Sequence, residues 1–196
     1  MGKRRSNVHE RPDLELITGS LKGILYFQEA LYKRYFSYAM SVAIRYAVNR
    51  SEAIEIVNDS FMKVLEKLGT YDNSKPFKPW YVKIIVNTAI DSYRKKIKKD
   101  ENLLNIDTDY DEKGKEPEIE TELTVNDILN LFSNMPDIYK LTFNLYEIEG
   151  YNHKEIGSIL GISESTSRSN LTRAKKLLRK LYVKYINSSE TNNEAV

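Results

Sequence analysis

Three carboxylates are the first side chains in this sequence whose types and spacing suggest chemistry. Glu52, Glu55 and Asp59 are separated by three and four residues, so they share one face if the segment is helical. Such a face can hold a metal ion, bind a basic partner or simply keep the surface soluble. The chain has no cysteine, and its two histidines, His9 and His153, lie far apart. We therefore expect no metal and no other cofactor, and on these residues alone plain solvation is favoured over a basic partner.

A second set of candidate side chains combines hydroxyl groups with positive charge near the C-terminus. In a helix over residues 164–185, Leu171, Ala174 and Leu177 fall on one side, which is expected to pack. The opposite arc has hydrogen-bond donors and cations but no carboxylate. Such an arc is suited to binding base edges and phosphates of DNA. The alternative is a lysine-rich face that only contacts solvent. The predicted DNA-facing residues are Ser165, Arg168, Ser169, Thr172, Arg173, Lys175 and Arg179.

The turn before this basic helix has the chemistry of a helix-turn-helix. A short amphipathic helix is predicted over 153–160, Gly161 permits a positive φ where it stops, and Ser163 can cap the next helix. In a helix-turn-helix the second helix enters the major groove. The N-terminal half of that helix is then expected to reach bases, and its basic C-terminal half to lie along phosphates.

The segment FKPWYVKIIVNTAIDSYRKKIKK, residues 77–99, carries a tryptophan on the polar face of a predicted helix. Trp80 either packs sideways as peripheral core or acts as an aromatic wedge at an opened duplex. In the second interpretation Lys83 and Arg94 contact phosphates, and Asn87 lies near an unstacked base. The candidate nucleic-acid residues of this face are Trp80, Lys83, Asn87, Arg94 and Lys98.

An all-α architecture is predicted to position these side chains, because apolar residues recur at helical spacing and alternating runs are almost absent. Residues 13–99 are expected to form one small helical domain and residues 124–186 a second. The tether between them, residues 100–123, is expected to be a flexible acidic linker. Helices are predicted at 13–21, 26–47, 51–68, 78–98, 125–133, 137–149, 153–160 and 164–185, and a frayed tail from residue 188.

Charge is strongly segregated along the chain, although the net charge of the 196 residues is only +2. From Asp100 to Asp127 there are eleven carboxylates against two lysines, whereas Glu164 to Lys184 holds seven basic residues and one acidic. No apolar run approaches the roughly 18 residues of a membrane helix, and no signal-peptide stretch follows the start. We expect a cytoplasmic protein without membrane insertion.

Both halves resemble one protein family. The stretch YNHKEIGSILGISESTSRSNLTRAKKLL is similar to the promoter-reading helix-turn-helix of bacterial RNA polymerase sigma factors of the small extracytoplasmic-function (ECF) group. Residues 51–68 resemble that family's polymerase-docking region, and residues 77–99 resemble its minus-ten region. Ser167 stands where the family usually has an apolar residue; we expect its hydroxyl to bond back to a carbonyl one turn earlier.

The resemblance implies a sigma factor that binds core RNA polymerase and promoter DNA and starts transcription without catalysing a bond change. Residues 13–99 then correspond to sigma domain 2, and residues 124–186 to sigma domain 4. The acidic linker is implied to thread the RNA channel of the polymerase; the alternative is a linker that is acidic only for solubility. An anti-sigma factor is a further possible partner. The implied polymerase contacts are Glu52, Glu55, Asn58 and Asp59.

Two other functions stay open at this point. The first is a stand-alone helix-turn-helix transcription regulator whose first half is a sensing or dimerising bundle. The second is an enzyme acting on nucleic acid with magnesium at Glu52, Glu55 and Asp59. Affinity for core polymerase separates a sigma factor from the regulator, and chelator-sensitive activity on DNA would indicate the enzyme.

Overall fold

The computed structural model describes residues 11–99, 132 and 134–193, and all regular elements in these ranges are helical. The prediction of an all-α chain is confirmed for them. The predicted linker at 100–123 and most of the predicted helix at 125–133 lie outside the described residues. The chain divides into two compact units, one up to Asp91 and one from Ser92 onward. Within the described ranges, no helix has a stretch long and apolar enough to cross a membrane.

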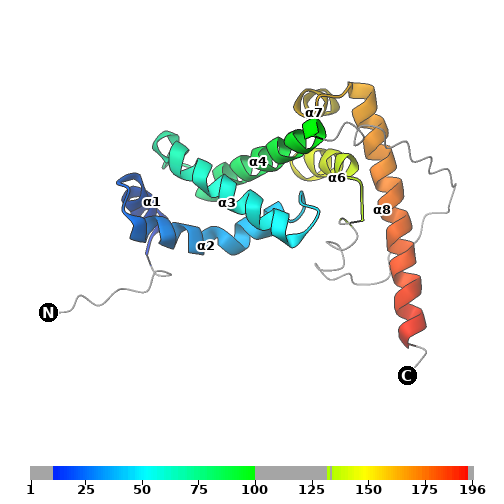
Figure 1. The fold of residues 1–196 in the computed structure, drawn as a ribbon, viewed down its shortest axis with the longest axis horizontal. Coiled ribbons are helices and arrows are strands. Elements are labelled where there is room, and N and C mark those ends of the chain that lie inside the picture. The colour runs from blue at the N-terminus through cyan, green and yellow to red at the C-terminus, as the bar shows by residue number, and fades with distance from the viewer. Residues whose placement is uncertain (1–10, 100–131, 133, 194–196) are drawn as a thin grey trace. The chain divides into compact units, whose positions relative to one another are not determined.

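The N-terminal unit is a bundle of helices that pack in chain order, as Figure 1 shows for α1 to α3. Short turns join consecutive helices, and a single 3-10 turn follows the third helix. The elements are α1 (Asp13–Leu21), α2 (Leu25–Ala43), α3 (Arg50–Lys67), the 3-10 turn η2 (Leu68–Thr70) and α4 (Phe77–Lys99), whose last residues belong to the second unit.

The core of the N-terminal unit takes apolar side chains from all four helices. Leu16, Leu31, Val57, Val64 and Ile85 are completely inaccessible to solvent. Burying one such side chain contributes about 1.5–3 kcal/mol relative to leaving it exposed. The helical periodicity in the sequence is therefore explained by this shared core.

Polar contacts at the edge of the core tie the helices together. Asp13 at the start of α1 accepts hydrogen bonds from Arg34, at 2.7 Å, and from the hydroxyl of Tyr35 in α2. Burial and the bond to Asp13 raise the pKa of Tyr35, so the hydroxyl stays protonated and continues to donate. Lys63 of α3 pairs with Asp91 of α4 at 2.9 Å.

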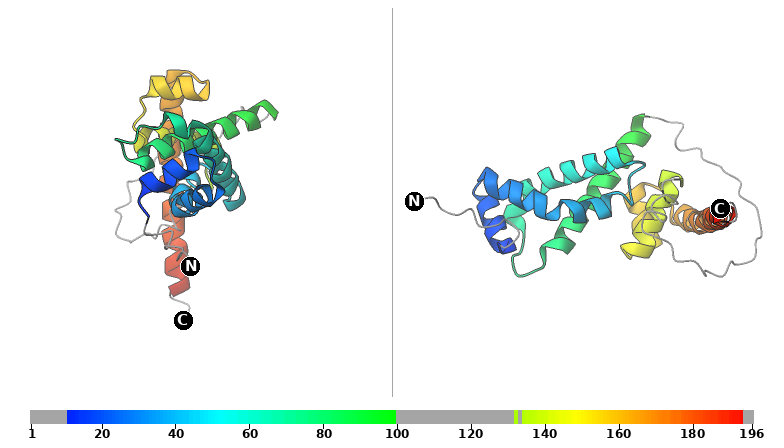
Figure 2. Two further views of the ribbon diagram at one scale, coloured as in Figure 1. Left: turned by 90° about the vertical axis from the view of Figure 1, so that its left-hand side faces the viewer. Right: turned by 90° about the horizontal axis from the view of Figure 1, so that it is seen from below.

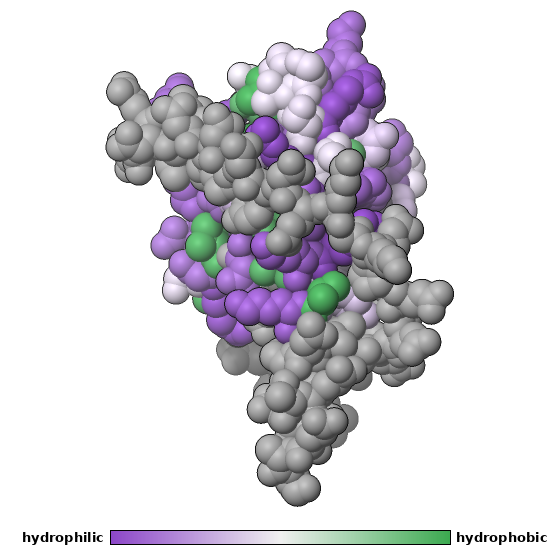
Figure 3. All heavy atoms as spheres, turned by 90° about the vertical axis from the view of Figure 1, so that its right-hand side faces the viewer, coloured by the Kyte–Doolittle hydropathy of each residue, from purple (hydrophilic) through white to green (hydrophobic). Residues whose placement is uncertain are grey.

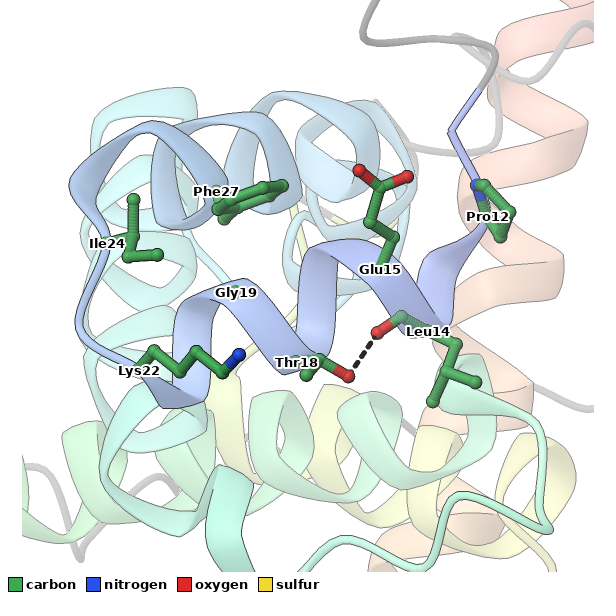
Figure 4. Close-up of a pocket in the computed structure, with 8 residues that line it drawn as sticks. All are labelled: Pro12, Leu14, Glu15, Thr18, Gly19, Lys22, Ile24 and Phe27. Carbon is green, nitrogen blue, oxygen red and sulfur yellow. Dashed lines mark hydrogen bonds between the residues drawn. The ribbon is translucent and has the colours of Figure 1, made fainter.

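A hollow of about 420 Å³ lies between α1 and the start of α2 (Figure 4). The hydroxyl of Thr18 donates to the carbonyl of Leu14 at 2.7 Å, so this polar group is satisfied within α1. Gly19 forms part of the wall, and a Cβ there would lie 2.2 Å from the ring of Phe27. The close approach of α1 and α2 therefore depends on a residue without a side chain at position 19.

The C-terminal unit places two short helices and a π-helical turn against one long helix. Figure 2 shows α8 extending well past the other helices of this unit. The elements are α6 (Asp137–Phe143), the π-helical turn η4 (Asn144–Ile148), α7 (His153–Leu160) and α8 (Glu164–Asn193). Their shared core contains Phe132, Met135, Tyr139, Ala174 and Leu177.

Three predicted helix boundaries were wrong. The helix expected at 26–47 ends at Ala43, because Arg45 and Tyr46 turn back to carbonyls three residues earlier. The helix expected at 137–149 gives way to η4 from residue 144, and α8 continues to Asn193 where a frayed tail was expected from residue 188.

Candidate nucleic-acid interface

The helix-turn-helix predicted over residues 153–185 is present, and its turn is fixed by local hydrogen bonds. Gly161 adopts φ 71° and ψ 31°, the left-handed conformation that favours glycine. The hydroxyl of Ser163 accepts the amide of Thr166 at 3.0 Å, which caps α8 as predicted. At the other end of α7, Asn152 and Glu155 form a reciprocal capping box. Both helices of the motif therefore have defined starts.

Close backbone packing at Gly157 sets how tightly the turn folds onto α7. A Cβ at this position would lie 2.7 Å from the carbonyl oxygen of Ile162, closer than real side chains approach. Gly157 is itself buried. The backbone of the turn therefore occupies the space that a side chain would need.

Replacing Gly157 by alanine is expected to destabilise the C-terminal unit by about 1–3 kcal/mol, because the turn must move away from α7. Thermal unfolding followed by circular dichroism measures this loss. The matched control is Ser158→Ala on the exposed side of the same helix, which should not lower the midpoint by more than about 2–4 °C. Equal midpoints for the two variants would contradict the packing argument.

All predicted DNA-facing residues of α8 are exposed, and the opposite side is buried as predicted. Leu171 and Leu177 are 7% exposed, and Ala174 is completely buried. Among the coloured residues of Figure 3, purple hydrophilic and near-white ones predominate, and green hydrophobic ones occur only in small separate spots. The exposed residues are Ser165, Arg168, Ser169, Thr172, Arg173, Lys175 and Arg179.

Two carboxylates lie beside these cations, so the prediction that the arc lacks acidic groups was wrong. Glu164 pairs with Arg168 one turn later, and Glu147 of η4 pairs with Lys175 at 2.7 Å. The spacing of four residues could have revealed the first pair. The second pair joins residues far apart in sequence, and nothing in the local pattern predicts it.

The π-helical turn η4 explains how Glu147 reaches α8. The amide of Glu149 bonds to the carbonyl of Asn144, five residues earlier, at 3.0 Å. Asn144 and Leu145 are completely buried, whereas Tyr146 and Glu147 point outward. The wider turn thus brings Glu147 to Lys175 and the ring of Tyr146 onto His153, where the centroids are 4.5 Å apart.

We expected the hydroxyl of Ser167 to bond back to a carbonyl, but no such bond is found among the described residues. Its partner is a histidine instead. Its Oγ lies 3.0 Å from Nδ1 of His153, and both side chains are buried. Burial lowers the pKa of His153, and the nearby charge of Arg168 lowers it further. The polar residue on the packed side of α8 is therefore matched by a neutral imidazole.

On α4 the predicted face is exposed except at Trp80. Lys83, Asn87, Arg94 and Lys98 are accessible to solvent. Trp80 is half-buried, with its ring 5.0 Å from that of Tyr71 and 5.5 Å from that of Phe77. One part of Trp80 therefore packs on aromatic neighbours, and another part faces solvent; the role as a wedge stays a prediction.

The loop beside Trp80 is held by its own hydrogen bonds. Asp72 accepts from the amide of Ser74 at 3.0 Å and from its hydroxyl at 2.7 Å, and these bonds lower the pKa of Asp72. The hydroxyl of Tyr71 donates to the carbonyl of Lys75. Tyr71 and Trp80 consequently form an aromatic surface with a defined backbone beneath it.

On the predicted polymerase-docking face of α3, two residues form hydrogen bonds within the bundle and two are exposed. Glu52 accepts the amide of Val48 at 2.7 Å and helps to start the helix, and Asn58 accepts the hydroxyl of Tyr32 at 2.7 Å. Glu55 and Asp59 are exposed, and no ion pair involves them within the described residues. The same ranges contain no cluster of three or more His, Asp or Glu residues suited to a metal ion.

Comparisons with known proteins match both units. The family description of sigma-70 region 2 matches residues 31–98, and that of sigma-70 region 4 matches residues 126–178. The RNA polymerase sigma factor SigV of Bacillus subtilis is 33% identical over 138 residues, which cover 70% of this chain and 80% of SigV.

Two further matches belong to the same group of proteins. The ECF RNA polymerase sigma factor SigM of Bacillus subtilis is 27% identical over 162 residues, which cover 81% of this chain and 97% of SigM. A solved complex of the sigma factor RpoE with the anti-sigma factor NepR from Bartonella quintana aligns with a TM-score of 0.47 and 19% identity, covering 77% of this chain and 93% of the solved chain. Both regions occur in the same order as in the family, and the match covers most of the length of SigV. The chain therefore belongs to the ECF group of the sigma-70 family, the RNA polymerase sigma factors that direct promoter-specific transcription initiation.

Proposed function

We propose that the two halves of this sigma factor divide promoter recognition between them. Residues 13–99 dock on core RNA polymerase and open the minus-ten element, and residues 124–186 read the minus-thirty-five element. The observation that carries the second role is the arc of α8, where all predicted DNA-facing residues are exposed opposite a buried apolar side. The match of residues 31–98 to region 2 supports the first role.

Sigma factors act as initiation factors, and no catalytic step is assigned to this chain. We place its work in the cytoplasm, with core polymerase and promoter DNA as partners. The passage of residues 100–123 through the RNA channel and an anti-sigma partner stay predictions from the family resemblance. No observation favours the stand-alone regulator or the magnesium-dependent enzyme over a sigma factor.

Run-off transcription tests the proposal directly. Core polymerase with the purified chain is expected to transcribe a subset of a library of upstream regions, and core polymerase alone is expected to transcribe none of them specifically. The transcribed subset also reveals the promoter. A chain that binds DNA but leaves the output of core polymerase unchanged would contradict the proposal.

Arg168 is expected to read a base, whereas Lys175 and Arg179 are expected to contact phosphates. A bidentate arginine–guanine contact is worth about 1–3 kcal/mol of discrimination, so Arg168→Ala should relax preference at one minus-thirty-five position. Lys175→Ala and Arg179→Ala should weaken all promoters alike and lower the salt slope by about one per lost contact. Lys175 must give up its ion pair with Glu147 when it contacts a phosphate, which offsets part of its contribution to affinity.

Selection from DNA randomised across the upstream element measures these effects. The proposal for Arg168 is wrong if its alanine variant returns the same base preferences as the wild type. The proposal for the two phosphate contacts is wrong if Lys175→Ala changes the selected sequence.

A further inference from the structure

A buried polar pair joins the two helices of the helix-turn-helix at the level of the base-reading residues. Nδ1 of His153 in α7 lies 3.0 Å from Oγ of Ser167 in α8. His153 is 8% exposed and Ser167 is 0% exposed. Ser167 immediately precedes Arg168 and Ser169, so a rotation of α8 at this pair moves both residues directly.

We propose that His153 is a positioning residue for reading of the minus-thirty-five element. In its neutral form it fixes the rotation of α8 on α7 through Ser167, and it thereby directs Arg168 and Ser169 at the bases. This inference rests on the proposed role of α8 in reading that element.

The imidazole ring is held in one orientation, so its hydrogen bond can set a direction. Its face stacks on Tyr146 of η4 with an interplanar angle of 20°. His153 is the first residue of α7, and Asn152 before it is fixed by the capping box with Glu155. An apolar side chain at 167 would still fill the space, but it would lack the directional bond that links the helices.

Charged and titratable groups around the ring explain why the neutral form is the one that fits. Arg168 of α8 lowers the pKa of His153 after burial, whereas Glu164 of α8 acts in the opposite direction. The groups that contact the ring or act on its charge are Tyr146 on η4 and Glu164 and Arg168 on α8, while Lys154 and Glu155, which follow it in α7, are exposed.

Protonation of His153 would disturb the pair in two ways. Both ring nitrogens then donate, so in the tautomer in which Ser167 donates to Nδ1 that bond is lost, and a positive charge is placed at the N-terminus of α7 against the helix dipole. As pH falls below the ordinary histidine value of 6.5, the unfolded chain takes up a proton that the folded chain resists. The stability contribution is therefore fully present above 6.5 and is lost as the pH falls toward the lowered folded pKa, whereas the positioning is lost only as the pH falls through the folded pKa itself.

The test uses the full-length chain bound to core polymerase and selection from DNA randomised in the upstream element, at about pH 7.5 and about pH 5.5. His153→Asn keeps a partner for Ser167 but does not titrate. His153→Phe keeps the aromatic stack but removes the hydrogen bond. His9→Asn, which removes the chain's other histidine, is the matched control.

The wild type and His9→Asn should lose part of their preference for the selected over a scrambled element at the lower pH, with full protonation corresponding to about tenfold, which is the size of one base contact. His153→Asn should hold its preference at both pH values, and His153→Phe should lose it at both. Adding Ser167→Val to His153→Phe should restore part of it, because no hydroxyl is then left unpaired.

The inference is overturned if the wild type and His153→Asn share one pH profile, or if a folded His153→Phe keeps the wild-type preference. If circular dichroism shows that His153→Phe is unfolded, the inference is decided by comparing the pH profiles of the wild type and His153→Asn alone. If Arg168→Ala has the same base preference as the wild type at the higher pH, the proposed function is overturned, and the inference with it.

Discussion

Replacing Glu55 and Asp59 together by lysine is expected to lower the affinity of the protein for core RNA polymerase by roughly a hundredfold, with the fold intact. Both carboxylates are exposed on α3, and in the part of the chain that the structure describes neither forms an ion pair. The charge reversal places two lysines against the basic surface of the polymerase that the docking proposal requires. Glu52 is left unchanged, because it accepts the amide of Val48 and supports the start of α3.

A matched variant separates a docking surface from a general effect of charge. Glu15→Lys with Glu29→Lys changes the net charge by the same amount, and both residues lie in exposed pairs with Arg11 and Lys33. Losing such a pair costs about 0–1 kcal/mol, and the like-charge contacts with Arg11 and Lys33 cost a few tenths more each, so this variant should still fold and bind polymerase. Equal losses for both variants in a low-salt binding assay would remove α3 as the docking face.

Trp80→Ala with Asn87→Ala should leave polymerase binding unchanged while open-complex formation drops by tenfold or more. Stacking of one base on an aromatic side chain is worth about 1–3 kcal/mol, and the wedge interpretation assigns that contact to Trp80. Asn87 is exposed about two helical turns further along α4. Permanganate footprinting of the minus-ten element measures the opened bases.

The half-buried position of Trp80 requires a control for packing. Trp80→Phe keeps a ring against Tyr71 and Phe77, and Asn87→Ala alone touches only an exposed side chain. Thermal unfolding of these variants and the double variant shows whether the aromatic cluster has collapsed. Normal melting of the promoter by a folded double variant would be incompatible with the wedge, and a loss of fold would assign Trp80 to the core.

The sequence predicted those parts of the fold that local chemistry determines. The turn at Gly161, the cap at Ser163 and the buried side of α8 follow from a left-handed residue, a capping hydroxyl and a helical repeat of apolar residues. Each depends on neighbours within about one helical turn. Such features can be read without knowledge of the rest of the molecule.

The missed features depend on contacts between residues distant in sequence. His153 and Ser167 are fourteen residues apart, and their pairing requires the crossing of α7 and α8. The pair between Glu147 and Lys175 requires the wider turn of η4, whose defining hydrogen bonds leave no mark in the pattern of apolar residues. Ser167 was visible as an unusual polar residue on the packed side, but its partner was not.

The π-helical turn has a consequence for changes in chain length. A bond that spans five residues instead of four accommodates one extra residue, so deleting one residue from Asn144–Ile148 can restore an ordinary helix while the helices on either side keep their faces. The same deletion inside α8 would rotate all later side chains by about 100°. This turn is therefore a segment of the C-terminal unit in which a one-residue deletion can leave the faces of α6 and α7 in place, while the contacts of Tyr146 with His153 and of Glu147 with Lys175, which support α8, are lost.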